Sequence, residues 1–272
     1  MICAKIIHLP ALRTYAVTEL YTYEQPTNER IRAFLRLEKL FKQYDVHLKQ
    51  GNIWSHAVAI DSINELLAFT GRSDVKLEAL KELERQHVRL QRLSTRSQID
   101  QNQLESLLNK QKKLIIELQS IQGQLGQSTQ SVELLSALRK KSSVPGCICD
   151  FDLPAYQYWQ SLPEQTRTSH IQEWFKPFSV LDQSILLILD VLRHSVEDSN
   201  EIAASGFFQK SIDTNQSIQL LRISIDPGSD YYPEISAGKH RFSIRFTSNK
   251  DPSGRPEQCA EDINFKLNLC TI

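Results

Sequence analysis

Arg241 and Arg245 are the residues whose type and spacing point most directly to chemistry. In the segment 239–247, the large apolar residues Phe242, Ile244 and Phe246 alternate with polar ones, which predicts a strand with one face toward a core. Both arginines then stand on the opposite face, on either side of Ser243. A planar guanidinium group suits bidentate contacts with carboxylates, so the pair could grip an acidic peptide. A solvated sheet face explains the same pattern, and the spacing alone leaves both interpretations open.

Basic residues also recur on two predicted helices. In a helix expected from about 28 to 47, the basic residues at i, i+4 and i+7 are Arg32, Arg36 and Lys39. In a helix expected from 74 to about 93, Arg85, Arg89 and Arg92 lie toward the C-terminal end. A solvated helix face is the ordinary interpretation. The alternative function is a nucleic-acid-binding protein that tracks phosphates, but no aromatic residues are interleaved with these basic stripes.

The cysteines show neither a disulfide framework nor a complete metal site. Cys147 and Cys149 form the one metal-like fragment, but a structural zinc site needs four converging ligands, typically from two short-spaced pairs. The other cysteines are Cys3, Cys259 and Cys270, and none of them supplies a second pair. We therefore expect reduced thiols and no metal.

Motifs for catalysis and nucleotide binding are missing from the sequence. The phosphate-binding G-x-x-x-x-G-K-[ST] and the dinucleotide fingerprint G-x-G-x-x-G do not occur, and neither do G-x-S-x-G and H-E-x-x-H. The seven histidines are scattered without pairing at ligand spacing. The sequence thus predicts a protein that works by binding another protein, with no cofactor, rather than an enzyme.

The elements that must position these residues begin with a run of helices. Asn28 precedes the first helix and can cap its N-terminus. A second helix, about 54 to 69, is expected to stop at Gly71 in a left-handed conformation, with Arg72 directly after it. Further helices are expected at 74–93, at 131–141, and in a segment between these two whose apolar positions run from Leu104 to Ile121. Three more are expected to start at Pro154, Pro163 and Pro177. The last one, to about Val196, is apolar on nearly every side, which predicts the central helix of the bundle.

After Ser199 the spacing of apolar residues drops from helical to two. The alternating segments are Leu221–Ile225, Phe242–Phe246 and Ile263–Leu269. We expect half-buried antiparallel strands, joined by the turn Asp226–Gly228 and by the long polar loop Ser248–Glu261. The fold class is therefore α+β, with an N-terminal all-α helical bundle domain and a smaller C-terminal antiparallel β-strand domain.

Charge and hydropathy limit the class of protein further. Lys and Arg balance Asp and Glu at 32 each, so the net charge gives no long-range attraction to nucleic acid or anionic lipid. The most apolar stretch, Val180–Leu192, is shorter than the ~20 residues of a spanning helix. We expect a cytoplasmic protein without membrane insertion. Its parts are expected to be a loose N-terminal extension at 1–22, a helical domain at 23–198 and a β-strand domain at 199–272.

Short motifs spread along the chain carry a family resemblance. They are Tyr23–Arg32 (YEQPTNERIR) continuing through Phe34–Glu38, Leu80–Gln86, Val144–Gly146 leading into Phe151–Pro154, Gly206–Gln209, and Tyr232–Ser236 followed by Arg241–Phe246. From about Tyr23 to the C-terminus the chain thus resembles ZapD, a family of bacterial cell-division proteins. The resemblance implies an α-helical domain and a β-strand domain in a protein that forms a homodimer.

The resemblance also implies a function and its residues. Such a dimer binds the C-terminal tail of FtsZ, crosslinks and bundles FtsZ protofilaments, promotes Z-ring assembly at mid-cell and lowers FtsZ GTPase activity. Basic residues tied to tail binding in that family map onto Arg241 and Arg245 of the predicted strand, and onto Arg72 after the second helix. For Arg241 and Arg245, this moves the balance from a solvated face toward a binding role.

Overall fold

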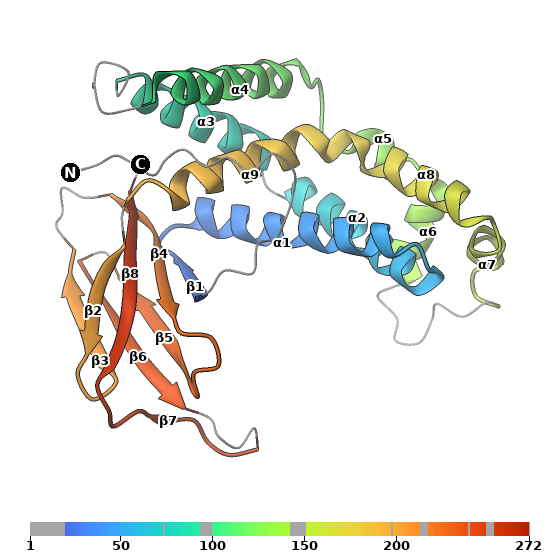
Figure 1. Ribbon diagram of the computed structural model, residues 1–272. Helices are drawn as coiled ribbons and strands as arrows, with labels where there is room; N and C mark the ends of the chain where they lie inside the picture. Colours follow the sequence, from blue (N-terminus) through green and yellow to red (C-terminus); the bar gives the residue numbers. More distant parts are fainter. Residues whose placement is uncertain are drawn as a thin grey trace. The chain divides into compact units, whose positions relative to one another are not determined.

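The computed structural model has helices in its N-terminal part and antiparallel strands in its C-terminal part, which confirms the predicted α+β class (Figure 1). It describes residues 20–72, 74–92, 100–141, 151–196, 198–212, 217–238, 240–248 and 253–271. Two compact units are present. The strand unit takes in the chain up to Arg32, residues 89–105 and residues 189–272, and the helical unit takes in residues 33–88 and 106–188.

The helices correspond closely to the predicted ones. They are α1 (Glu29–Gln50), α2 (Ile53–Arg72), α3 (Val75–Gln91), α4 (Gln101–Ser120), α5 (Gln127–Gln130), α6 (Glu133–Lys141), α7 (Pro154–Gln160), α8 (Glu164–Phe175), the 3-10 turn η1 (Lys176–Phe178) and α9 (Ser179–Arg193). Asn28 caps α1 as predicted, because its side-chain oxygen accepts a hydrogen bond from the N–H of Ile31 at 2.9 Å. Asn52 caps α2 in the same way through the N–H of Ser55.

The end of α2 differs from the prediction. Gly71 lies inside the helix, is not among the glycines with positive φ, and Arg72 is the last helical residue. The next helix, α3, begins at Val75, and Asp74 caps it by accepting a hydrogen bond from the N–H of Leu77. Helix α2 therefore does not end with the predicted left-handed glycine.

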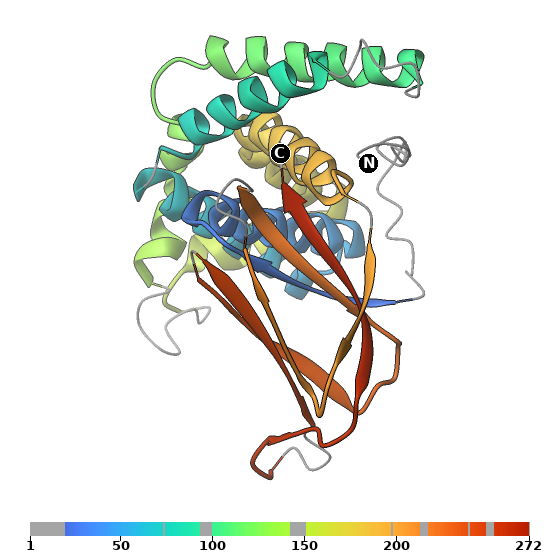
Figure 2. The same cartoon turned by 90° about the vertical axis from the view of Figure 1, so that its left-hand side faces the viewer.

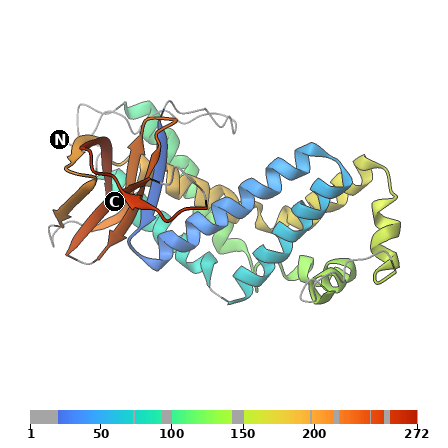
Figure 3. The same cartoon turned by 90° about the horizontal axis from the view of Figure 1, so that it is seen from below.

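Two of the three predicted proline starts also differ. Pro154 is the first residue of α7, as expected, whereas Pro163 is the N-cap of α8 and Pro177 lies in η1, before α9 begins. The last helix, predicted from its apolar sides to be the central one, is largely buried, since Gln183 is the one exposed residue of α9. In the helical unit, α2 packs against α8 and α6 (Figure 3).

Helices α3 and α4 lie antiparallel and side by side (Figures 1 and 2). Their polar edges are joined by hydrogen bonds from Gln119 to Glu84 and between His87 and Gln111. At the end of this pair, the Lys76 ammonium donates to the backbone carbonyl of Ile121 at 2.8 Å.

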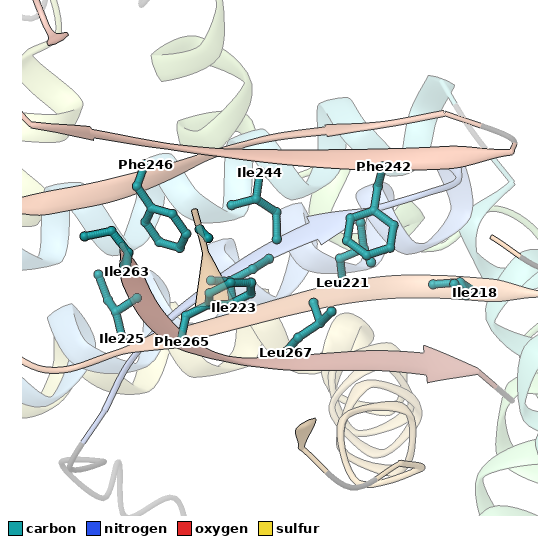
Figure 4. Close-up of a cluster of buried hydrophobic side chains, with 11 residues drawn as sticks. Ile218, Leu221, Ile223, Ile225, Phe242, Ile244, Phe246, Ile263, Phe265 and Leu267 are labelled. Carbon is teal, nitrogen blue, oxygen red and sulfur yellow. The ribbon is translucent and has the colours of Figure 1, made fainter. Parts of the chain in front are cut away.

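The strands form two antiparallel four-stranded sheets. They are β1 (Tyr21–Pro26), β2 (Ser199–Ala203), β3 (Phe207–Ser211), β4 (Ile218–Ile225), β5 (Tyr231–Ala237), β6 (Arg241–Ser248), β7 (Glu257–Gln258) and β8 (Ile263–Thr271). One sheet has the order β1-β4-β8-β2, and the other has the order β3-β6-β5 with β7 paired to the end of β6. The two inner faces enclose the core of the strand unit, where Phe242, Ile244 and Phe246 of β6 point toward the side chains of β4 and β8 (Figure 4).

The three predicted strands correspond to β4, β6 and β8, but other strands were not predicted. Along the chain, β5 follows β4 and precedes β6. The turn Asp226–Gly228 therefore leads into β5 and not into the strand that carries the arginines. Strand β7 lies within the segment predicted as a polar loop. Tyr21 and Thr22, predicted as part of a loose extension, belong to β1 and pair with Ile225 and Ser224 of β4. The expected division at 22/23 and 198/199 stays a prediction.

An ion network holds β1 in place. Glu24 accepts hydrogen bonds from Arg193 at 2.7 and 2.8 Å and from Arg222 of β4 at 2.9 Å. Burial by itself would raise the pKa of the Glu24 carboxyl. The hydrogen bond and charge of Arg193 and the charge of Arg222 outweigh burial and hold that pKa below its ordinary value.

Candidate partner-binding surface

The prediction that both arginines point away from the core is confirmed. Along β6, Phe242, Ile244 and Phe246 are buried, whereas Arg241 and Arg245 are exposed. Strand alternation produces this pattern, because successive side chains leave a pleated backbone on opposite faces. We call the outward side of the sheet β3-β6-β5 the arginine face.

Strand register defines the neighbours of each arginine. Arg245 lies directly between Phe207 of β3 and Glu234 of β5, and Arg241 lies opposite Ser211 of β3. Between them, Ser243 lies opposite Gln209 and Ser236. The arginine face therefore carries two cations separated by a neutral polar row. It ends at Thr247, which is buried where β7 pairs with β6.

Neither arginine of this face is neutralised by a partner in the described part of the chain. No ion pair within 4.0 Å joins Arg241 or Arg245 to a described carboxylate, and this includes Glu234, although it lies in register with Arg245. By contrast, Lys210 of β3 is paired with Glu201 at 3.1 Å. No carboxylate of the described residues thus accepts from Arg241 or Arg245, and both side chains have donors suited to a carboxylate from outside the chain.

Arg72 lies in the helical unit, at the wall of a cavity. The cavity has a volume of about 490 Å³ and lies where α2, α3 and the segment after α4 meet. Most of its lining is polar: Asp74 adds a negative charge, and Lys76, whose ammonium is bound to the backbone carbonyl of Ile121, adds a second positive charge. Arg72 is exposed, so the cavity offers a cation among mainly polar groups.

Comparisons with known proteins identify the family. The family model of ZapD, described as a cell division protein, matches residues 35–245. The chain belongs to the ZapD family. It is 36% identical over 250 residues to the cell division protein ZapD of Methylococcus capsulatus, and this alignment covers 92% of this chain and 98% of that protein. It is also 36% identical over 249 residues to the ZapD of Bordetella petrii, with 92% of this chain and 98% of that protein covered.

Membership in the ZapD family assigns the chain to cell division and confirms the resemblance found in the sequence. The ZapD family is named for a role in cell division and not for a catalysed reaction. Within the described residues, no group of three His, Cys, Asp or Glu side chains is placed to hold a metal ion. Cys147 and Cys149 lie outside those residues. Cys270 is buried, and burial raises the pKa of its thiol to about 12.

The basic helix faces of this ZapD-family chain are partly occupied by its own acidic residues. Arg32 pairs with Glu29 on α1, and Arg85 of α3 donates to the fully buried Glu82 at 2.9 Å. Arg36, Lys39 and Arg89 are exposed, as a solvated helix face predicts. In the described part of the chain, no helix is both long and apolar enough to cross a membrane.

Two residues of the arginine face, Phe207 and Glu234, were missed by the sequence analysis. Phe207 is 40% exposed and adjoins Phe208, whose ring packs in the core against Phe242 at a tilt and against Phe265 edge to face. Two adjacent phenylalanines on a strand must point to opposite faces, and this was the available signal. For Glu234 no such local signal exists, because its position beside Arg245 depends on the pairing of β5 with β6.

Proposed function

We propose that this chain binds the C-terminal tail of FtsZ and, as a homodimer, crosslinks and bundles FtsZ protofilaments. One observation carries the proposal. In a chain of a cell-division family, Arg241 and Arg245 lie exposed on one sheet face, and no carboxylate among the described residues forms an ion pair with either. Carboxylates of the tail would accept charge-assisted hydrogen bonds from both guanidinium groups. We assign Arg72 to tail binding as well, because it presents an exposed cation at the cavity between α2 and α3.

Bundling follows if each particle carries two tail-binding faces. A homodimer supplies them, and filaments that display many tails raise the effective concentration at which the second face binds. We propose that bundling in turn promotes Z-ring assembly and lowers FtsZ GTPase activity. The place of action is then the cytoplasm at mid-cell.

Co-sedimentation with FtsZ polymers tests the binding step. We expect the chain to pellet with full-length FtsZ in the presence of GTP and to stay in the supernatant when the FtsZ tail is deleted. The Arg241→Ala/Arg245→Ala variant should also stay in the supernatant, while Arg36→Ala, which removes an exposed arginine from α1, serves as the matched control. Equal pelleting with tail-less polymers would refute tail binding.

The dimer is tested separately. Sedimentation equilibrium should give twice the mass of the 31.3 kDa chain, and electron microscopy should show bundles only above the concentration at which the dimer forms. A monomer that still bundles filaments would refute the homodimer as the crosslinking particle.

A further inference from the structure

The spacing of the two arginines limits what can bind to both. Arg241 and Arg245 are four residues apart on one strand, which corresponds to about 13 Å between their backbones. Side chains stand roughly perpendicular to a sheet, so the guanidinium groups keep a similar separation. This spacing favours two separate carboxylates over a single one that bridges both arginines. An extended segment places side chains at i and i+4 at the same spacing.

The two sides of Arg245 differ in charge and polarity. In register, the Cβ atoms of Glu234 and of Phe207 each lie about 5 Å from that of Arg245, on opposite sides. A carboxylate that approaches over β5 meets the like charge of Glu234. One that approaches over β3 meets no acidic residue in register and passes the exposed ring of Phe207. Arg241 has no charged neighbour in register: Ser211 lies opposite it on β3, and no residue of β5 is paired with it.

Phe207 is not among the described residues that form or pack against the core cluster of the strand unit. The adjacent Phe208 provides the core contacts of this turn of chain, with ring centroids 6.2 Å from Phe242 and 5.2 Å from Phe265. No ring contact involving Phe207 is present among the described residues. An aromatic ring that is 40% exposed beside an available guanidinium offers a partner both apolar surface and a charge-assisted contact.

We propose that the arginine face recognises an extended acidic segment that lies on the β3 side of β6. Two of its carboxylates, four residues apart, bind Arg241 and Arg245, and an apolar side chain packs on Phe207. Glu234 acts as a competing carboxylate of the chain itself, which weakens binding at Arg245 and excludes the β5 side. The inference rests on the proposed function only for the identity of the segment, which is then the FtsZ tail.

Neutralising the competing carboxylate tests the role of Glu234. Glu234→Gln should tighten binding of the FtsZ tail peptide about two- to fivefold in calorimetric titration at low salt, the range of exposed charge pairs. The gain should shrink at 1 M salt, where the screening length is about 3 Å. Glu257→Gln is the matched control, because it removes the same charge from the exposed strand β7 of the same sheet and should leave affinity unchanged.

Removing the exposed ring tests the role of Phe207. Phe207→Ser should weaken binding of the same peptide about three- to tenfold without lowering the melting temperature, consistent with loss of one partly exposed aromatic contact. Ile202→Ser is the matched control, since Ile202 is 59% exposed on β2, in the other sheet. Unchanged affinity for Phe207→Ser, or weaker binding by Glu234→Gln, would overturn the inference.

A designed peptide separates this inference from the FtsZ assignment. The probe is a Gly/Ser/Thr peptide with one Leu and two Glu four residues apart, compared in NMR titration with the same composition carrying adjacent Glu residues. Preferential binding of the spaced peptide, strengthened by Glu234→Gln, supports the inference even if the FtsZ tail does not bind. Equal binding of both peptides overturns it even if the FtsZ tail does bind.

Discussion

Adjacent residues on β6 should give opposite phenotypes when changed to alanine. Phe246 is fully buried, with its ring 5.2 Å from that of Phe265 and 5.7 Å, edge to face, from that of Tyr231. Removing such a ring costs about 3 to 5 kcal/mol of unfolding free energy, so Phe246→Ala should lower the melting temperature by roughly 6 to 20 °C. Arg245→Ala removes an exposed side chain and should change stability by only about 0.5 kcal/mol or less.

The arginine variants, which should hardly change stability, should strongly weaken binding. Arg245→Ala or Arg241→Ala removes a charge-assisted contact worth about 1.5 to 3 kcal/mol, or about ten- to a hundredfold in affinity. Because the two sites lie about 13 Å apart, the losses should add in the double variant and bring it to or below the limit of detection. Arg→Lys should recover only part of the affinity, because an ammonium keeps the charge but lacks the planar fork.

The assay combines thermal unfolding with calorimetric titration of the FtsZ tail peptide, on each single variant and on the double variant. A folded double variant with unchanged affinity would return both arginines to the solvated-face interpretation. A large drop in melting temperature for Arg245→Ala would show that the faces of β6 are assigned the wrong way round.

Three further predictions concern other parts of the chain. Glu24→Gln should cost about 2 to 3 kcal/mol in urea unfolding, because it leaves Arg193 and Arg222 without their shared carboxylate. The pKa of Glu24 is lowered in the folded state, so its contribution to the free energy of unfolding is complete above the unfolded-state pKa and is lost as pH falls through the folded-state pKa. The stability of the wild type should therefore fall more steeply with acid than that of the variant. Arg72→Ala should weaken FtsZ-tail affinity in titration without changing the melting temperature, since Arg72 is exposed. Affinity for random duplex DNA at physiological salt should be negligible in a polarisation assay, whereas a phosphate-tracking protein would bind with a salt slope near −0.9 per phosphate contact.

The sequence predicted those features that local patterns determine. Alternation of apolar and polar residues was sufficient to place β6 and the outward direction of Arg241 and Arg245, because the period of a strand is two. The cap at Asn28 was predictable for the same reason, since an N-cap acts within three residues. The predicted end of α2 was wrong because Gly71 permits a left-handed conformation without requiring one, and in the structure it is part of the helix.

Strands that depend on distant partners could not be predicted in this way. Strand β1 ends in Glu-Gln-Pro and has no extended apolar alternation, yet it pairs with β4 about two hundred residues later in the chain, with Thr22 and Ser224 hydrogen-bonded at 2.8 Å. Its position is fixed by Glu24, which lies between an arginine of α9 and one of β4. Single-sequence patterns carry no information about such pairings, because the stabilising groups come from other elements.

The neighbours of the arginines follow from the core rather than from their charges. On β5, Pro233 is buried and Ile235 packs against the core cluster, so both must point inward and Glu234 between them must point outward. A slip of one residue in the pairing of β5 with β6 would turn these apolar residues to solvent, which costs far more than an exposed charge pair contributes. The register that sets Glu234 beside Arg245 is therefore held by apolar burial on the opposite face. Substituting Glu234 consequently changes the electrostatics of the arginine face while leaving its geometry intact, and this makes the residue a direct probe of what the face binds.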